Sequence, residues 1–348
     1  MPSYSVPLRD MKFVYNELFD PTDISALPGF EDATEDLINP ILEEAARLAE
    51  NELFPLNTTG DLEGCQFDNG HVTTPQGFID AYKQYADGGW VGLPCDPKYG
   101  GQGIPAAVNV LMEEMACSAN VSFATYVGLT RGAYRAVNTF ASDDLKNQFL
   151  PKMVSGEWSG TMCLTEPQCG TDLGLIKTKA ALQSDGTYTL SGTKIFITAG
   201  EHDLTQNIIH LVLARLPDAP NGIKGISLFL VPKFLPDTEG NPSTRNSIYC
   251  ARIENKMGIK ASATCEMNLD DATGWLIGEP HKGMRAMFTM MNDARLGVGI
   301  QGLGIGESAY QAAATYARDR QQGRALNGAK MPNAPADSLL VHPDIRRT

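Results

Sequence analysis

The sequence predicts an α+β protein with an all-α N-terminal domain, a central antiparallel β-domain and the first helices of a second α-domain. Apolar residues recur at helical spacing from Asp32 to Gly156 and again after Lys282. Between these two regions, short β-type runs are separated by turn-forming residues. We therefore divide the chain into an N-terminal extension, a helical domain, a β-domain and a second helical segment, at residues 1–35, 36–157, 158–281 and 282–348.

Composition narrows the class of protein. The chain has 348 residues, of which 43% are hydrophobic and 20% are charged, as in ordinary globular proteins. Its formal net charge of -13 argues against nucleic acid and anionic membranes as partners, because both attract basic surfaces. No apolar run reaches the length of a membrane span, and no apolar core follows the N-terminal stretch MPSYSVPLRD, as it would in a signal peptide. We expect a cytoplasmic protein.

The cysteines and histidines give no sign of a disulfide framework or a metal site. The seven cysteines are scattered along the chain without a C-x-x-C pair, which favours reduced thiols in a reducing compartment. The five histidines lack the spacing of metal ligands. We therefore expect no metal cofactor.

The N-terminal extension is rich in proline and aromatic residues. Its apolar side chains, among them Leu8, Met11 and Phe13, are too numerous for a solvated tail. We expect this arm to pack on the body of the protein.

The helical domain begins with Asp32 and Glu35, which have the spacing of a capping box, and continues as an apolar stripe at helical spacing up to Pro55. Caps and periodicity predict further helices over residues 76–88, 105–118, 121–140 and 142–156. A glycine-rich stretch runs from Trp90 to Gly103. Because it lacks the lysine and hydroxyl residue of a phosphate-binding P-loop, we interpret it as a structural turn.

Two β-type segments end near hydroxyl-bearing and small residues. The first runs from Gly160 to Thr165 and leads into a turn at Gly170, and the second, residues 194–200, ends at a glycine. Two such ends can form a wall for a planar polar ligand, although ordinary strand ends with satisfied turns have the same pattern. Further strands are predicted over residues 176–182, 187–192, 207–216, 225–232, 247–254 and 265–271, with an exposed insertion at 236–246.

Helical periodicity resumes after Lys282 with a row of methionines, which most simply fills a core. A long helical run then extends from Ala294 to Arg320 and contains GVGIQG, Gly297 to Gly302. This glycine pattern matches the dinucleotide fingerprint, but that fingerprint needs a preceding strand. We interpret these small residues as a means for two helices to approach closely.

Two segments of the β-domain resemble the signature motifs of the flavin-dependent acyl-CoA dehydrogenase family. LTEPQCGTD, Leu164 to Asp172, resembles T-E-P-x-x-G-[ST]-D, and GTKIFITAG, Gly192 to Gly200, resembles G-x-K-x-[WF]-I-T-x-G. They have the family's order and separation. The string from Pro7 to Phe19 is similar to an N-terminal extension in a subgroup that includes 3-methylmercaptopropionyl-CoA dehydrogenases. The resemblance implies the acyl-CoA dehydrogenase fold, with the β-domain against the isoalloxazine ring of FAD.

The resemblance also implies roles for residues of the two motifs. Thr165 and Thr198 offer hydroxyls to the polar edge of the isoalloxazine, and Phe196 packs against the ring. Thr171 contacts ligand phosphate or the CoA moiety of the substrate. The remaining flavin-binding positions are the backbone of Met162, Leu164 and Ile197, and Gly170, which lets the backbone come close.

Two arginines in the second helical segment also match family positions. Arg295, within Met291 to Gly304, corresponds to an arginine near the CoA moiety. Arg320, within Tyr316 to Leu326, corresponds to an arginine that reaches the FAD of a neighbouring subunit, although the usual phenylalanine after it is missing. For both arginines, a solvated helix face or an intrahelical pair is the alternative interpretation.

The activity implied by the resemblance is FAD-dependent α,β-dehydrogenation of an acyl-CoA thioester to the trans-2-enoyl-CoA. Electrons would pass to an electron-transfer flavoprotein, and the enzyme would be a homodimer or homotetramer. A flavin-dependent acyl-CoA oxidase and a non-catalytic flavin- or CoA-binding module remain alternatives. Oxygen consumption during turnover would indicate the oxidase. Flavin that stays oxidised when substrate is added would indicate the binding module.

The catalytic base is not expected among the motif residues. The family counterpart of Glu166 is structural, and the family's catalytic glutamate lies beyond the segment that contains Arg320. The sequence ends at Thr348, shortly after a helix start at Pro343 with Asp344 in the first turn. We expect the C-terminal helical domain to be truncated and the glutamate to lie beyond Thr348.

Overall fold

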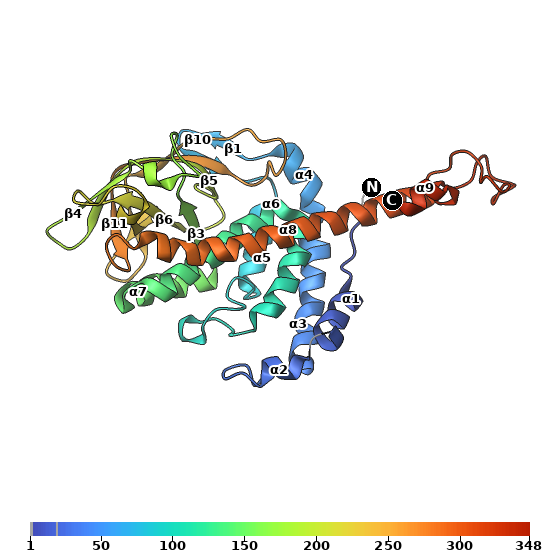
Figure 1. Ribbon diagram of the computed structural model, residues 1–348, viewed down its shortest axis with the longest axis horizontal. Coiled ribbons are helices and arrows are strands. Elements are labelled where there is room, and N and C mark those ends of the chain that lie inside the picture. The colour runs from blue at the N-terminus through green and yellow to red at the C-terminus, as the bar shows by residue number, and fades with distance from the viewer. Residues whose placement is uncertain (1–2, 19) are drawn as a thin grey trace.

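The computed structural model describes residues 3–18 and 20–348. Figure 1 shows a helical half beside a β-sheet half, and the long helix α8 (Gly283–Asp319) crosses both. Helices, then strands, then helices follow one another along the chain in the predicted order. The predicted α+β fold is therefore confirmed.

The helical half begins with several short helices, and longer helices follow. The first of these helices are α1 (Leu8–Phe13), α2 (Pro21–Ser25), α3 (Glu35–Leu48), α4 (Pro55–Glu63) and α5 (Phe78–Asp87), with π-helical turns at Val14–Leu18 and Ala49–Leu53. The capping box predicted at Asp32 and Glu35 is wrong. Thr34 is the N-cap of α3, and its backbone N–H donates to the carbonyl of Asp32 at 2.7 Å. A turn thus occupies the residues that the capping box would need.

Helix α6 (Ala106–Phe140) consists of two arms, residues 106–119 and 121–140, separated by a break at Asn120. Asn120 has extended backbone angles, φ -159° and ψ 89°. Its side chain donates to the carbonyl of Leu53 at 3.2 Å and accepts from the backbone N–H of Phe123 at 3.1 Å. It therefore caps the second arm, and the two helices predicted here are confirmed.

Helix α7 (Asp143–Ser155) has the ends that the sequence predicts. Ser142 is the N-cap and accepts from the backbone N–H of Leu145 at 3.4 Å, and Gly156 ends the helix at a positive φ of 82°. The chain then enters the β-sheet.

The β half is a seven-stranded sheet in the order β10-β11-β5-β4-β6-β3, with β7 paired to both β6 and β11. Two small hairpins, β1 (Gln66–Asp68) with β2 (His71–Thr73) and β8 (Phe234–Pro236) with β9 (Pro242–Arg245), flank it. The strands of the sheet are β3 (Trp158–Cys163), β4 (Lys179–Leu182), β5 (Tyr188–Thr198), β6 (Asn207–Arg215), β7 (Ile226–Pro232), β10 (Ile248–Ile253) and β11 (Thr264–Ile277).

The sheet differs from the predicted one in two respects. It is mostly antiparallel, but β6 pairs in parallel with β3 and, at Lys179 and Arg215, with β4. The chain between β3 and β6 makes a long crossover through β4 and β5, which permits the parallel pairing. The two strands predicted at 187–192 and 194–200 form the single strand β5. Gly192 stays paired with Leu269 of β11, so it does not interrupt the strand.

Strand β3 lies directly against the second arm of α6. The backbone N–H of Gly160 donates to the hydroxyl of Thr130 at 3.1 Å. A Cβ atom at Gly160 would lie 2.5 Å from the Cβ of Ala133, so only glycine permits this contact. The close approach places the end of β3 beside α6.

Helix α8 contains the whole GVGIQG stretch, with no strand before it, so the dinucleotide fingerprint does not apply. The helix-contact interpretation is wrong for Gly297, Gly299 and Gly302, since none of them has a described atom within 4 Å of its ideal Cβ position. The close approach to α6 occurs instead at Gly304, outside this stretch, whose Cβ would lie 2.9 Å from the backbone nitrogen of Ser118.

The methionines of α8 pack on the core, as expected, with Met284 and Met291 partly buried against it. Met287 and Met290 are fully buried, whereas the side chain of Phe288 is exposed. No helix in the described ranges combines the length and apolar character needed to cross a membrane.

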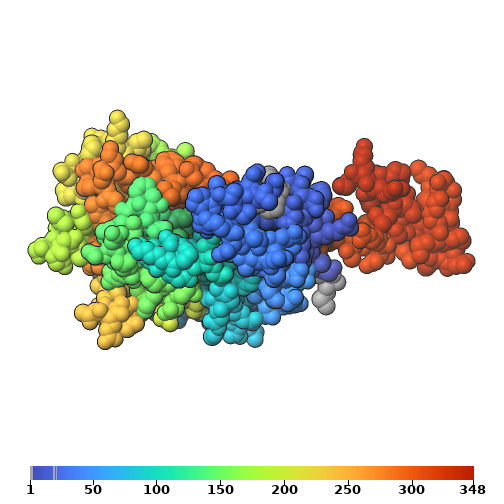
Figure 2. Space-filling model, turned by 90° about the horizontal axis from the view of Figure 1, so that it is seen from below, coloured from blue at the N-terminus to red at the C-terminus, as the bar shows by residue number. Residues whose placement is uncertain are grey.

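The two terminal segments lie differently on the molecule. Tyr4, Val6 and Met11 of the N-terminal arm are buried in the core of the helical half, and the side chain of Gln311 on α8 bonds to both backbone groups of Ser5. Phe19 lies outside the described residues. After α8, the segment that ends in α9 (Pro343–Arg347) projects from the body, as Figure 2 shows.

Candidate functional site

The side chains of Glu166 and Lys194 join the two motif segments. Both are buried, and Nζ of Lys194 lies 2.9 Å from Oε1 of Glu166. The Glu166 carboxylate also accepts from the Thr178 hydroxyl at 2.6 Å and from the backbone N–H groups of Lys177 and Thr178 at 2.7 and 3.0 Å. Burial raises the pKa of Glu166, but the Lys194 charge and these hydrogen bonds outweigh it and lower the pKa to about 2. Glu166 is thus a structural carboxylate, as its family counterpart implies.

The backbone of the two segments is joined as well. The backbone N–H of Ile195 donates to the carbonyl of Thr165 at 2.9 Å, and Nζ of Lys194 donates to the carbonyl of Leu164 at 3.0 Å. The ends of β3 and β5 therefore lie side by side, which the sequence could suggest only through the order of the motifs. Thr165, Leu164 and Thr198 are half-buried along this edge.

Phe196 and Ile197 face opposite ways at the end of β5. Phe196 has a positive φ of 58° and exposes 58% of its surface, whereas Ile197 is 1% exposed and packs into the core of the sheet. An aromatic side chain with this much free surface can cover a flat ligand. Gly170 and Thr171 are exposed on the loop after β3, and a Cβ at Gly170 would lie 3.2 Å from Cγ2 of Thr165.

A pocket of about 300 Å³ opens where α6, α8 and the β-domain meet. Met162 and Thr198 line it from the β-domain, together with Ile259 of the loop before β11. The helices supply a largely apolar wall, lined by Tyr85, Ala116, Phe123, Val127, Leu129 and Ala294 among others. The structure thus brings Met162 and Thr198 to this pocket, while Leu164, Thr165, Gly170, Thr171 and Phe196 lie on the adjoining edge.

The two predicted arginines lie on α8 and at its C-terminal end. Arg295, on α8, donates to the Asn292 side chain at 2.7 Å and stacks over the Phe288 ring at 5.4 Å from the centroid, so it takes part in contacts within its own helix. Arg320 follows the last residue of α8, whose end in Figure 1 lies far from the sheet of the same chain. Its side chain is exposed.

A charged cluster in the pocket was not predicted. Arg131 of the second arm forms an ion pair with Glu113 of the first arm, and its Nε lies 3.7 Å from Oδ2 of Asp293 on α8. Arg135 pairs with the same aspartate at 2.7 Å. Burial lowers the pKa of Arg131, and Asp293 opposes that shift. An arginine inside the apolar run YVGLTRGAYRAV was the one signal in the sequence that pointed to this cluster.

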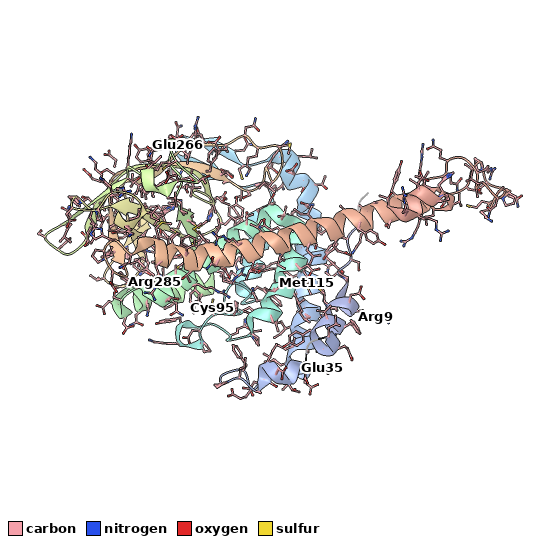
Figure 3. All side chains as sticks on the ribbon, viewed as in Figure 1. Arg9, Glu35, Cys95, Met115, Glu266 and Arg285 are labelled. Carbon is pink, nitrogen blue, oxygen red and sulfur yellow. The ribbon has the colours of Figure 1, made fainter. Side chains whose placement is uncertain are left out.

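The pocket has two chemically different sides. Figure 3 labels Cys95 and Met115 on the helical side of α8 and Glu266 on the β-domain, across α8 in this view. Glu113, Arg131 and Asp293 all come from the helical side, whereas Met162 and Thr198 come from the β side. In the described residues, no group of three or more histidine, cysteine, aspartate or glutamate side chains is arranged to hold a metal ion.

Comparison with known proteins identifies the fold. The chain matches the N-terminal domain of acyl-CoA dehydrogenase over residues 38–157 and the middle domain over residues 161–272. The 3-methylmercaptopropionyl-CoA dehydrogenase of Ruegeria pomeroyi is 46% identical over 345 residues, 99% of this chain. This chain covers 58% of that relative's length.

Two solved structures are similar at the level of the chain trace. An acyl-CoA dehydrogenase complexed with FAD from Bacillus anthracis has a TM-score of 0.69 at 26% identity, covering 84% of this chain and 46% of that one. A chain from the structure described as an electron transferring flavoprotein of Acidaminococcus fermentans has a TM-score of 0.70 at 26% identity. The match covers 86% of this chain and 72% of that one. With both domains and the subgroup relative matched, the chain belongs to the acyl-CoA dehydrogenase family.

Proposed function

We propose that this chain binds FAD and an acyl-CoA thioester as part of an acyl-CoA dehydrogenase that forms the trans-2-enoyl-CoA. The observation that carries the proposal is the position of Met162, two residues before the first motif segment, and of Thr198, in the second, on one wall of the pocket between α6, α8 and the β-domain. Pockets where domains meet are the usual sites for a cofactor and its substrate.

The residues at the edge of this pocket fit an isoalloxazine ring. The hydroxyls of Thr165 and Thr198 are half-buried, and neither takes part in a hydrogen bond with other described residues. Each can therefore serve a polar ring edge as donor or acceptor. The exposed Phe196 offers an aromatic face beside them. The solved FAD complex in the same family supports this choice of cofactor.

When bound, FAD would supply the acceptor for the β-hydride. The chain's own residues bind and orient the thioester. Phe123, Val127 and Leu129 provide apolar surface for the acyl chain and keep water from the reacting carbons. Thr171 and Arg295 are the proposed contacts for the CoA part, and both side chains are exposed and accessible.

The general base is proposed to lie outside residues 1–348. Glu166 is enclosed by Lys194 and four further hydrogen bonds. Glu113 and Asp293, the carboxylates that line the pocket, are paired with arginines. A carboxylate held by a cation in this way is a weak base, because the cation stabilises its ionised form.

Arg320 is proposed to serve the FAD of a partner subunit in a homodimer or homotetramer. Arg320 follows the end of α8 that lies far from the β-sheet, so its side chain is placed to contact another subunit. An electron-transfer flavoprotein is the proposed electron acceptor, in line with the similarity to the Acidaminococcus fermentans structure. A cytoplasmic location is part of the same proposal.

Anaerobic titration of the FAD-loaded protein with a panel of acyl-CoAs tests the proposed reaction. We expect the flavin absorbance to bleach in a version extended to the full length of its relatives, and to bleach far more slowly in the 348-residue chain. Loss of a general base alone costs about 10²–10⁴ in rate. Flavin that stays oxidised in the extended protein would support a binding module, and rapid oxygen consumption would support an oxidase. Equal rates in both forms would place the base within residues 1–348.

A further inference from the structure

Ile259, in the loop before β11, has a backbone conformation that isoleucine rarely adopts. Its φ is 48°, in the left-handed region. Six described residues other than glycine have a positive φ, and Ile259 is the one β-branched member of that set. A branched Cβ crowds the backbone in the left-handed region, so this conformation costs free energy in the folded protein.

The surroundings of Ile259 hold the loop in this conformation. The backbone N–H of Lys260 donates to Oδ1 of Asp61 on α4 at 3.0 Å. The buried hydroxyl of Tyr126 on α6 donates to the carbonyl of Ala261 at 3.0 Å. A strained residue persists only where its surroundings impose the strain, and such residues cluster at ligand sites. The backbone of Ile259 thus has a feature that is typical of ligand-binding residues.

Packing in a hydrophobic core does not account for the strain. Ile259 exposes 39% of its surface and belongs to none of the apolar clusters in the described part of the chain. Instead it lines the pocket between α6, α8 and the β-domain, together with Met162 and Thr198. The side chain therefore offers apolar surface to a ligand in that pocket.

Backbone strain is concentrated around Thr198. Phe196 and Ala199, which lie on either side of it in the chain, have positive φ values of 58° and 56°. The loop that contains Ile259 leads into β11, whose first residue, Thr264, pairs with Thr198. Three of the six positive-φ residues thus lie around the paired ends of β5 and β11.

We infer that Ile259 packs against the isoalloxazine ring of FAD and holds it against Thr198. This inference rests on the proposed function, which gives the Thr198 hydroxyl to the polar edge of that ring. Because Ile259 has no polar side-chain atom, it contributes apolar contact, while Thr198 contributes the hydrogen bond. Contact with the ring offsets the strain at Ile259, so the cost of the strain falls on the FAD-free protein.

The inference predicts opposite effects of one substitution on stability and on FAD binding. Ile259→Gly relieves the strain, because glycine adopts a positive φ without steric cost. It removes no side chain from an apolar cluster of the described residues. The FAD-free variant should therefore unfold at an equal or higher denaturant concentration. FAD should dissociate about tenfold faster from the loaded variant, because the apolar contact is lost.

Two further variants separate the contact from the backbone effect. Ile259→Leu keeps an apolar side chain of the same size, so FAD should dissociate at a rate close to that of the unaltered protein. The control is Asn69→Gly, which makes the same backbone change at a φ of 47° in the exposed turn between β1 and β2. It should not affect FAD release. Flavin fluorescence after dilution of the loaded proteins measures dissociation, and chemical denaturation followed by circular dichroism measures stability.

The outcomes distinguish this inference from the proposed function. Release from Ile259→Gly at the unaltered rate, or release from Ile259→Leu as fast as from Ile259→Gly, would overturn the contact with the ring. If Ile259→Gly lost stability along with FAD, or did not fold, Ile259 would be a structural residue and the inference would also be overturned. In each of these cases the proposed function stands, since the unaltered protein binds FAD. Failure of the unaltered protein to bind FAD would overturn both.

Discussion

Lys194 Nζ lies 2.9 Å from Glu166 Oε1, and the two side chains expose 0% and 3% of their surface. The pair joins the loop after β3 to strand β5, so it holds the two motif segments next to each other. Burial lowers the pKa of Lys194 while Glu166 opposes that shift, and each partner thus sustains the charge of the other. Glu166, within the motif LTEPQCGTD, is thus held in structural contacts.

Replacing Glu166 with glutamine should destabilise the protein severely. The change leaves the Lys194 ammonium buried without an anion, and losing one partner of a buried pair costs about 3–5 kcal/mol. Chemical denaturation followed by circular dichroism measures the loss. Glu239→Gln, at an exposed position in the β8–β9 turn, is the control and should change stability by less than about 0.5 kcal/mol. Equal stability of the two variants would contradict the structural role.

Acid should destabilise the fold through His202 and His210. Burial, followed by nearby cations, lowers the pKa of both side chains to about 3 from an ordinary value of 6.5. Between these values the unfolded chain binds more protons than the folded one. The free energy of unfolding therefore falls as the pH falls below about 6.5, by about 1.4 kcal/mol per pH unit for each histidine.

Chemical denaturation at several pH values from 4.5 to 7 measures how the free energy of unfolding changes with pH. In this range neither histidine is protonated in the folded protein. His210→Gln should reduce the slope by roughly one proton, about 1.4 kcal/mol per pH unit, whatever its effect on stability at neutral pH. A slope in His210→Gln equal to that of the unaltered protein would rule out His210 as a titrating group.

Replacing Arg320 with alanine should weaken FAD binding only in the oligomer. A charge-assisted hydrogen bond contributes about 1.5–3 kcal/mol, and we expect a loss of that size. Fluorescence titration combined with light scattering measures affinity and mass on one sample. Arg318→Ala, also exposed in the last turn of α8, is the control and should bind FAD normally. A monomer that holds FAD as tightly as the oligomer, with Arg320→Ala neutral, would refute the assignment to the partner subunit.

Local signals predicted most of the fold. Ser142 and Gly156 delimit α7 as their types predict, because caps act through neighbouring backbone groups. A break between residues 118 and 121 was also predicted, and the structure places it at Asn120. The capping box at Asp32 failed because the turn up to Thr34 competes for the same residues. The parallel pairing of β3 with β6 depends on how far the chain travels between them, which periodicity does not report.

The candidate site was predicted only where it rests on motifs. The edge formed by Thr165 and Thr198 follows from two segments with recognisable sequences. The charged cluster does not, because the Glu113–Arg131 pair depends on how the two arms of α6 fold back at Asn120, and the pairs with Asp293 form only when α8 packs on α6. A single arginine in an apolar helix indicates a buried charge, but the sequence does not show which residues pair with it.

The claim that the β-domain edge holds the flavin is tested most directly by titrating the apoprotein with FAD and following flavin fluorescence. We predict saturable binding that Thr198→Val weakens by about 1–2 kcal/mol, because the variant keeps the shape and removes the hydroxyl. The control is Thr189→Val on the same strand, where the Thr189 hydroxyl accepts a hydrogen bond from the Gln183 side chain at 3.0 Å. This variant should bind FAD like the unaltered protein. Absence of saturable binding, or equal affinity in Thr198→Val and Thr189→Val, would contradict this placement of the flavin.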